Sequence, residues 1–452
     1  MFVSDLHLHS KYSRAVSQDM ILPTMSSWAK KKGIDILTTG DWTHPIWFRE
    51  IQSQLTEAKD GIYKLKNEEE SEKKTPRFLL TVEVSSIYSQ GGKLRRIHNL
   101  IFAPNFETAG KINKEFLRRG ANLMADGRPI VGLSAKEVLE LILSVDERAM
   151  LIPCHAWTPW FSLYGSNSGF DSIDECFGDY AKYIYGIETG LSSDPVMNWK
   201  IPELANRSIL SFSDAHSPAK MGREATVFAP RGNVGIDDLT YDDIVGAIKQ
   251  ETQVKLKIRY TIEFYPEEGK YHYTGHRNCK VVQSPEDTAK NGTMCPVCKR
   301  KLTVGVEHRV QELAKNVAVE SKIQSDAHGA KWIGDPVNNR PPYVSLVPLL
   351  EIVAEALLST TSSQKVKDLY DQLVKSLGTE FDILLRAPVE EIEKRVGTRV
   401  AEGVRKVRER NIVVIPGFDG EYGVVKIWNG GSGDNLLAAE VKEEENSQLG
   451  LF

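Results

Sequence analysis

The sequence predicts an α/β fold in its first half, followed by a short cysteine-bearing segment and then a mainly helical region. Short apolar runs alternate with helical patterns up to about residue 250, which is typical of a parallel sheet or a barrel. The segment from Val254 to about residue 306 is basic, rich in turn residues and holds three of the five cysteines. Helical patterns dominate from Glu307 onward. These changes in character divide the chain into regions with different expected structures.

The first region, residues 1–253, is expected to be built from strand–helix units. Its predicted strands are apolar runs at Phe2–Leu6, Ile34–Thr39, Phe78–Val84, Ile97–Ala103, Met150–Cys154, Tyr183–Glu188 and Ser208–Ser213. Helical periodicity is clear between some of them, at Leu22–Lys32 and Ser134–Ser144. Because strands connected through helices run parallel, this region is predicted to form a parallel sheet or a barrel.

The later regions follow other patterns. Residues 254–306 are predicted to form a small domain of their own, and residues 307–428 a mainly helical domain. The predicted helices there are Val347–Leu358, Gln364–Leu377 and Val389–Arg410. A hairpin follows, with strands at Ile412–Ile415 and Val424–Trp428 around a glycine-rich turn. Residues 429–452 are glycine-rich and then acidic, which predicts a flexible tail.

The composition is that of an ordinary globular chain. Its 452 residues include 57 Lys and Arg against 61 Asp and Glu, and this near-balance argues against a strongly basic nucleic-acid coating protein but not against local basic patches. A hydrophobic content of 41% excludes wholesale disorder. No apolar run reaches the roughly 18–20 residues of a membrane span, and the N-terminus does not resemble a signal peptide. Five cysteines are too few for a disulfide scaffold, so a reducing, cytoplasmic location is expected.

Histidine and carboxylate residues gather at the ends of the predicted strands. Six of the ten histidines lie in or just after separate strands. In the first strand Asp5, His7 and His9 alternate, so all three should point to one side at its C-terminal end. The other members of this set are Asp41, His44, Glu83, His98, His155, Asp214 and His216. Imidazole and carboxylate groups are ligands of zinc, manganese and iron, so the set predicts a multinuclear metal site that ionises a water for attack on phosphorus.

Four further ligand-type residues have the spacing of a structural zinc site. Two residues separate His276 from Cys279, and two separate Cys295 from Cys298. Two knuckles of this spacing supply four tetrahedral ligands, as in a zinc ribbon. His272 competes with His276 as a ligand, but it breaks the two-residue spacing. The Lys and Arg residues around this group suit contact with a phosphate backbone.

Two loops should flank the predicted metal site. One holds several aromatic residues between positions 157 and 170, and the other spans positions 188–195. Exposed aromatic rings beside a phosphoesterase site can stack on a flipped base, while Ser and Glu groups read its edge. The alternative is that these rings pack over the end of the barrel. The residues expected to bind substrate are Trp160, Tyr164, Glu188, Ser192 and Ser193.

The metal-ligand motifs resemble those of the polymerase and histidinol phosphatase (PHP) superfamily. The resemblance rests on DLHLHS at the N-terminus, the strands around Glu83, His98 and His155, and SDAH at Ser213–His216. It implies a distorted β/α barrel with a two- or three-metal phosphoesterase centre. By position, one ion would be held by the catalytic residues His7, His9, Glu83 and Asp214. Glu83 would bridge to a second ion on His98 and His155, and His216 would bind a third.

The sequence departs from the family pattern around the third ion. Many members have an acidic or His ligand a few residues after the HxH pair, where this chain has Tyr12, Ser13 and Arg14. The usual TDH triplet is replaced by GDWTH, so either Asp41 or His44 takes the ligand role. The expected cofactors are therefore one structural zinc ion in the ribbon and two or three divalent ions (Zn²⁺, Mn²⁺ or Mg²⁺) in the active site.

The last residues of the chain resemble a peptide with which bacterial replication proteins bind the sliding clamp. The sequence QLGLF places Gln448, Leu449, Leu451 and Phe452 at the positions that enter the clamp's apolar groove. A flexible acidic tail is a suitable place for such a peptide. The sequence therefore predicts the sliding clamp as a partner.

Over roughly Met1 to Trp428, the chain resembles the endonuclease Q family. The resemblance adds KYHYTGHRNC, CPVCKRKLTVGV, RPPYVSLVPLLEI and PGFDGEYG to the PHP motifs. It implies a DNA repair endonuclease that cuts 5′ to deaminated bases (uracil, hypoxanthine and xanthine) and abasic sites, with damaged DNA as its partner. The alternatives are a PHP-type phosphatase acting on a small phosphomonoester and a non-enzymatic DNA or clamp adaptor. The basic ribbon argues against the first, and the near-complete ligand set argues against the second.

Overall fold

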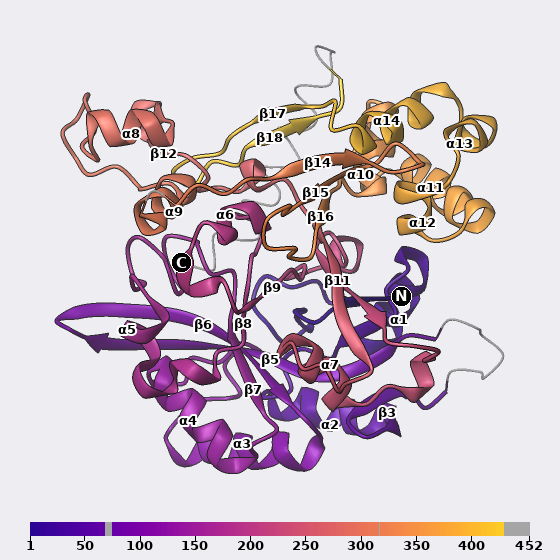
Figure 1. Cartoon of the computed structure of the whole chain (residues 1–452). Coiled ribbons are helices and arrows are strands. Elements are labelled where there is room, and N and C mark those ends of the chain that lie inside the picture. The colour runs from indigo at the N-terminus through magenta and orange to yellow at the C-terminus, as the bar shows by residue number, and fades with distance from the viewer. Residues whose placement is uncertain (68–74, 316, 429–452) are drawn as a thin grey trace.

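The computed structural model describes residues 1–67, 75–315 and 317–428 and has a mixed α/β fold around one large sheet (Figure 1). The twelve strands of this sheet are β1 (Phe2–Asp5), β2 (Ile36–Thr38), β3 (Leu55–Lys59), β4 (Ile62–Leu65), β5 (Arg77–Gln90), β6 (Lys93–Ala103), β7 (Met150–Pro153), β10 (Ala225–Pro230), β11 (Leu256–Glu263), β14 (Lys322–Ser325), β15 (Lys331–Gly334) and β16 (Tyr343–Ser345). Their order is β14-β15-β16-β11-β10-β1-β2-β5-β4-β3, and β6 pairs with both β5 and β7. Strands from the beginning and the later part of the chain therefore share one sheet.

The sheet is mixed rather than parallel, which corrects part of the expectation. Strand β2 lies parallel between β1 and β5, as predicted. Strand β10 is antiparallel to both β1 and β11, and β6 is antiparallel to both β5 and β7. The β5–β6 pair is a long hairpin that turns at Gly91 and Gly92, which have positive φ angles of 61° and 72°. Strands joined by so tight a turn must run antiparallel.

The helices of the first half lie in the connections between strands. They are α1 (Leu22–Lys32), α2 (Pro45–Gln54), α3 (Phe106–Arg118), α4 (Ala135–Val145), α5 (Ile173–Phe177), α6 (Pro195–Trp199) and α7 (Tyr241–Ile248). The two predicted helices are confirmed as α1 and α4. Helix α4 begins at a capping box, in which Ser134 and Glu137 bond each other's backbone amides. Helix α1 ends at Gly33, whose φ of 88° is the left-handed conformation that glycine adopts readily.

Strands β8 (Gly186–Glu188) and β9 (Ser208–Leu210) form a separate parallel pair. The cysteine-bearing segment contributes β12 (Thr274–His276), β13 (Val281–Gln283) and α8 (Pro285–Asn291), and β12 and β13 are antiparallel. Short 3₁₀ helices lie at Gly178–Tyr183, Pro202–Leu204, Pro218–Lys220, Ile236–Asp238, Pro266–Glu268 and Arg277–Cys279. Because β11 pairs with β10, the main sheet continues across the predicted boundary between residues 253 and 254.

The C-terminal region is largely helical, but it also contributes strands that were not predicted. Its helices are α9 (Val306–Ala314), α10 (Leu349–Ala356), α11 (Gln364–Leu377), α12 (Glu380–Leu385), α13 (Val389–Val396) and α14 (Thr398–Arg408). The single helix predicted over Val389–Arg410 is wrong, because Gly397 has a φ of 92° and separates α13 from α14. The predicted hairpin is confirmed as β17 (Val413–Ile415) and β18 (Val424–Lys426). In Figure 1 helices α10 to α14 lie together, away from α2, α3 and α4.

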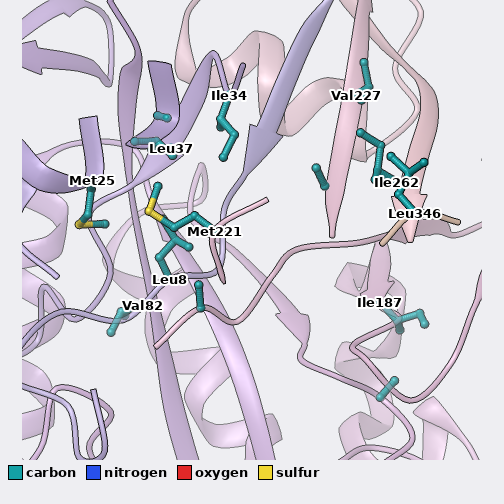
Figure 2. Packing of buried hydrophobic residues seen from close by; sticks show 14 of the residues in the cluster. Leu8, Met25, Ile34, Leu37, Val82, Ile187, Met221, Val227, Ile262 and Leu346 are labelled. Atoms are coloured by element: carbon teal, nitrogen blue, oxygen red, sulfur yellow. The ribbon is translucent and has the colours of Figure 1, made fainter. Parts of the chain in front are cut away.

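One hydrophobic core joins these regions. Leu8, Leu37 and Val82, which come from the first half of the chain, belong to the same buried cluster as Ile262 and Leu346 (Figure 2). All five side chains are 3% exposed or less. The C-terminal region is therefore packed on the main sheet rather than tethered beside it.

In the part of the chain that the structure describes, no helix has the length and apolar character needed to cross a bilayer.

Candidate metal centre

The first candidate ligands, His7 and His9, lie just beyond strand β1. The strand ends at Asp5, so the two histidines are in the loop that follows it and not within the strand as predicted. Their alternation is preserved because Leu8 pairs with Ala215 in a short parallel bridge and has its side chain in the core. Both imidazoles are fully buried. The loop therefore presents them on one side, next to the Asp214 loop.

Asp5 fixes the approach of that second loop. Its carboxylate accepts hydrogen bonds from the backbone N–H and the hydroxyl of Ser213, at 3.0 and 2.6 Å, and from the N–H of Gly222 at 2.8 Å. Burial raises the pKa of Asp5 to about 6, although these hydrogen bonds oppose the shift. Asp5 thus holds the residue before Asp214 in place.

His7, His9 and Asp214 form a first group that could hold a metal ion. The Nε2 atoms of His7 and His9 lie 3.6 and 3.0 Å from Oδ1 of Asp214. They also face Oε2 of Glu83, at 3.9 and 3.4 Å. Three ring and carboxylate atoms so close together, with Glu83 behind them, are the donor set of a divalent cation.

Glu83, His98 and His155 form a second group. Oε1 of Glu83 lies 2.6 Å from Nδ1 of His98 and 3.1 Å from Nε2 of His155. The two ring nitrogens are 3.3 Å apart. One oxygen of Glu83 thus faces each group, which is the arrangement expected of a carboxylate that bridges two ions.

The hydrogen bonds behind the histidines suit metal binding. Nδ1 of His7 lies 2.9 Å from Glu188, and Nδ1 of His9 lies 3.1 Å from Asp41. A carboxylate there fixes the tautomer, so that the Nε2 lone pair is free for a metal. Nε2 of His7 is buried and has no hydrogen-bond partner in the described structure, and the same holds for Nε2 of His216. These residues fit divalent ions, and buried Cys154 could add a ligand beside His7 and Glu83.

The carboxylates of the centre are held in their charged forms. Burial alone would raise the pKa of Glu83, but His98 and Arg128 outweigh it and hold that pKa well below its ordinary value. Burial likewise opposes ionisation of Asp214, and His7 and His9 keep its pKa well below the ordinary range. Ionised carboxylates are the form that binds metal.

Three site residues adopt backbone conformations that are uncommon for residues other than glycine. The φ angles are 46° at Asp41, 26° at His155 and 47° at Asp214. Such conformations cost free energy and persist where the surrounding structure enforces them, often at functional sites. Each of the three residues lies in the loop that follows a strand.

Of the residues expected around a third ion, Asp41 and His216 lie against the first group, next to His9 and Asp214, but Asp41, His44 and His216 do not form a group of their own. Asp41 accepts hydrogen bonds from the N–H and hydroxyl of Ser10 and the hydroxyl of Ser13, besides its contact with His9. The ring of His44 stacks on Tyr12 at a centroid distance of 4.4 Å. Over residues 1–67, 75–315 and 317–428, none of the groups able to hold a metal includes Asp41, His44 or His216.

The residues expected to bind substrate differ in exposure. Tyr164 is fully buried, packs its ring against Trp157 at a tilt and donates its hydroxyl hydrogen to Glu203 at 2.8 Å. Glu188 is fully buried behind His7 and also accepts the N–H of His155 at 2.7 Å. Ser193 is 1% and Ser192 7% exposed. These placements favour structural roles for the four residues.

Trp160 is partly exposed, and its ring packs edge-on against Tyr271 at 5.6 Å. The rest of its loop is fixed from two sides. Arg309 donates to the backbone oxygens of Tyr164 and Phe170, and Arg95 lies over the Phe170 ring. Trp160 therefore stands on a well-supported loop between the metal centre and the cysteine-bearing segment.

The predicted zinc ligands of that segment do come together. His276, Cys279, Cys295 and Cys298 form a group able to hold a metal ion, with Nδ1 of His276 3.4 Å from Sγ of Cys298. His276 ends β12, and the two last cysteines lie in a turn closed by a bridge between Met294 and Lys301. His272 is buried and contacts Glu307 instead. Four donors of this kind fit a tetrahedral zinc ion.

Sequence reasoning missed Arg128, whose Nη1 lies 3.2 Å from Oε2 of Glu83. It lies in an irregular loop with no periodicity, so nothing local to its sequence points to the site. Glu188 was predicted to bind substrate. A carboxylate that holds a histidine from behind cannot be told apart in the sequence from one that faces solvent. The predicted clamp peptide, Gln448, Leu449, Leu451 and Phe452, lies outside the described residues.

The chain is similar to known proteins over different shares of its length. The family described as the MJ0043 C-terminal domain matches residues 348–411. An uncharacterized protein from Methanocaldococcus jannaschii, MJ0043, is 33% identical over 273 residues. That match includes 60% of this chain but only 31% of the relative, so the chain spans about a third of the relative's length.

Two solved structures match nearly the whole chain. The lesion-specific endonuclease PfuEndoQ from Pyrococcus furiosus is 30% identical, with a TM-score of 0.77 over 96% of this chain and 98% of the other. A structure of Endonuclease Q in complex with a 27-mer duplex substrate with an abasic lesion at the active site is 31% identical, with a TM-score of 0.77 over 95% and 97% of the two chains. With this identity over almost its full length, the chain belongs to the endonuclease Q family.

Proposed function

We propose that this protein is a DNA repair endonuclease that hydrolyses a phosphodiester bond beside a damaged nucleotide. The observation that carries the proposal is the full-length likeness to a lesion-specific endonuclease and to an endonuclease bound to a duplex with an abasic lesion. The buried histidine and carboxylate groups around Glu83 supply a suitable centre for phosphodiester hydrolysis.

The finer substrate assignment extends the proposal. Its substrates are DNA duplexes carrying uracil, hypoxanthine, xanthine or an abasic site, and the cut lies 5′ to the lesion. Damaged or mismatched nucleotides are cheaper to extrude from a duplex than paired ones, which supplies part of the selectivity. Trp160, the partly exposed ring of the aromatic loop, is the proposed stacking partner of the extruded nucleotide.

In this proposal the centre is multinuclear and each residue has a defined task. Divalent ions bound there supply an activated water and stabilise negative charge on the phosphate oxygens. His7, His9 and Asp214 hold one ion, His98 and His155 hold another, and Glu83 lies between them. Glu188 and Asp41 keep His7 and His9 in the orientation and tautomer that leave Nε2 free.

The proposal also gives each region of the chain a role. Residues 1–253 form a PHP-type barrel that carries the centre, residues 254–306 include a zinc ribbon held by His276, Cys279, Cys295 and Cys298, and residues 307–428 form the helical part. The ribbon zinc is structural, and the basic side chains around it contact the DNA backbone. The QLGLF peptide of the tail is proposed to bind a sliding clamp.

The test is nicking of a 5′-labelled duplex that holds a single uracil, hypoxanthine or abasic site, in the presence of Mg²⁺ or Mn²⁺. The expected product is one cut 5′ to the lesion and none in the matched undamaged duplex. If none of the three duplexes is cut, the proposal is ruled out. Hydrolysis of small phosphomonoesters without cutting of DNA would favour a phosphatase instead.

A pair of variants ties the activity to the centre. Asp214→Ala removes a ligand of the first group and should abolish cutting while leaving DNA binding largely intact. Asp19→Ala removes an exposed carboxylate close in sequence to His7 and His9 and should cut like the wild type. Equal cutting by both variants would show that the ligand assignment is wrong.

A further inference from the structure

Arg128 brings a permanent positive charge into the metal centre. Its Nη1 lies 3.2 Å from Oε2 of Glu83, and its side chain is only 13% exposed. A guanidinium group has five N–H donors and stays protonated in proteins. In the described structure this contact with Glu83 is the one hydrogen bond that the side chain makes to the protein. Most of its donors are therefore available to a ligand.

The accessible side of the centre is the side on which Arg128 lies. Glu83 and His7 are completely covered, whereas the side chains of Asp214, His155 and Arg128 are 23%, 14% and 13% exposed. The side chain of His216, beside Asp214, is 18% exposed, so a phosphate group that reaches the centre from solvent meets these four residues first. Arg128 is the permanent cation among them, since Asp214 is an anion and the other two are histidines.

The segment that carries Arg128 is fixed on both sides of it. Gly127 donates its N–H to the backbone oxygen of Tyr12, and its own oxygen accepts the Thr43 hydroxyl. A side chain at Gly127 would come within 2.5 Å of Asp41, so only glycine permits this approach. After Arg128, the backbone of residues 129–131 pairs with Ser85, two residues beyond Glu83. Arg128 is thus held in place by the same elements that hold the metal ligands.

The family resemblance implies a third ion where the structure does not assemble its ligands. Asp41 is committed to Ser10, Ser13 and His9, and His44 stacks on Tyr12. The acidic or histidine ligand that many relatives have after the HxH pair is absent from this sequence. The centre nevertheless has a permanent cation beside Glu83, the guanidinium of Arg128.

We propose that Arg128 is a catalytic residue that binds a non-bridging oxygen of the scissile phosphodiester, in the role that a third metal ion has in related centres. The inference rests on the proposed function. During hydrolysis a bond forms between the water oxygen and phosphorus while one bridging P–O bond breaks. The water gives up a proton, the departing sugar oxygen takes one up and leaves as a hydroxyl, and negative charge grows on the non-bridging oxygens in the transition state. A fixed guanidinium stabilises that charge without reorganisation.

The first test compares single-turnover nicking by the wild type, Arg128→Gln and Arg128→Lys at saturating DNA. Loss of one charge-stabilising donor typically lowers such rates by about 10² to 10³-fold, and this is the expected effect of Arg128→Gln. Arg128→Lys keeps the charge and should fall between the two. The matched control is Arg14→Gln. Arg14 is exposed and pairs with Asp126, which lies two residues before Arg128, and the variant should cut at the wild-type rate.

The metal content separates a role toward substrate from a role in holding Glu83. Mass spectrometry should find the same number of ions per chain in Arg128→Gln as in the wild type. Loss of active-site ions in parallel with the rate would overturn the proposal, because Arg128 would then act only by supporting the ligands.

A substrate-side test does not depend on the folding of the variant. Sulfur replaces one or the other non-bridging oxygen of the scissile phosphate, and the rate loss caused by Arg128→Gln is measured on both stereoisomers. The loss should shrink at least tenfold for the isomer whose sulfur faces Arg128, and an equal loss on both isomers and on the normal substrate would overturn the proposal. If the wild type does not nick DNA, the proposed function is wrong, and the role of Arg128 with it. If the wild type nicks DNA but no faster than Arg128→Gln, only the role of Arg128 is wrong.

Discussion

The centre around Glu83 and the cysteine group around Cys298 use ordinary metal ligands in opposite surroundings. Glu83, His7 and His9 are at most 1% exposed, Glu83 within strand β5 of the main sheet and the two histidines in the loop after β1. Cys298 is exposed, and its group lies on a small hairpin and turn. In the centre, carboxylates hold the far side of the histidines, whereas His276 contacts its fellow ligand Cys298.

The two groups have the surroundings expected of a structural site and of a site that acts on a substrate. A structural zinc site is closed and gains its order from the metal, so its ligands need little support of their own. A site that acts on a substrate must keep its ligands in position while one side stays open. The hydrogen bonds of Glu188 and Asp41 behind His7 and His9, and the partial exposure of Asp214, match the second case.

Glu83→Gln is expected to have the largest effect, because both ligand groups meet at this carboxylate. The variant leaves Arg128 buried without its charged partner, and breaking such a pair typically costs about 3–5 kcal/mol. We expect single-turnover nicking to fall by roughly 10³-fold or more, with loss of the active-site ions and retention of the ribbon zinc. Activity assays and metal analysis of one preparation check both outcomes. A variant that keeps all its ions and its rate would show that Glu83 bridges nothing.

Glu188→Gln tests whether the support behind the ligands distinguishes the centre from the ribbon. The change weakens the hold on Nδ1 of His7 and on the N–H of His155. Loss of such a partner typically lowers metal affinity or activity about 10- to 100-fold, and titration of the apoprotein with Mn²⁺ measures it. The matched control is Glu203→Gln. Glu203 is a partly buried carboxylate in a short 3₁₀ helix that accepts hydrogen bonds from Tyr164 and Ile173, and its replacement should leave Mn²⁺ affinity unchanged. Equal losses of Mn²⁺ affinity in the two variants would mean that the contact between Glu188 and His7 has no special role in metal binding.

Cys298→Ser tests the other side of the comparison. It removes one of four ligands from the ribbon, so we expect loss of that zinc ion and weaker DNA binding, by about tenfold if the basic ribbon contacts several phosphates. At saturating DNA the nicking rate should remain within about threefold of the wild type, because the active-site ligands are untouched. A collapse of the saturated rate would mean that the ribbon positions the active site as well as the DNA.

The structure brings together several of the predicted ligands, His7, His9, Glu83, His98 and Asp214. The prediction placed them all at strand ends, but Glu83 and His98 lie inside the long strands β5 and β6. The direction of the strands was predicted only in part, since the hairpin between β5 and β6 has no helix and reverses the chain. Strands β14 to β16 were missed because each is only three or four residues long. They are held by successive pairing, β16 on β11, β15 on β16 and β14 on β15.

Other features could not be read from local pattern at all. The apolar periodicity of Val389–Arg410 continues through Gly397, and only the positive φ of that glycine reveals that two helices are present. Arg128 reaches Glu83 from 45 positions away. Contacts of this kind are decided by tertiary packing, which neither periodicity nor motif spacing records.

The smallest expected effect concerns Glu263, which is as fully buried as Glu83 but has hydroxyl partners in place of cations. Burial raises its pKa from 4.5 to about 8, although hydrogen bonds from Ser211 and Thr261 oppose the shift. The native state then binds more protons than the unfolded state, so stability falls as the pH rises from about 4.5 to about 8. Glu263→Gln keeps an acceptor for the two hydroxyls and removes the charge, and it should flatten this fall by at least about 1.4 kcal/mol, the equivalent of one pKa unit. Urea unfolding at pH 5 and pH 8.5 measures it. An unchanged pH profile would mean that Glu263 is ionised in the folded protein. The lack of cationic partners would then make no difference to the protonation of Glu263 and Glu83.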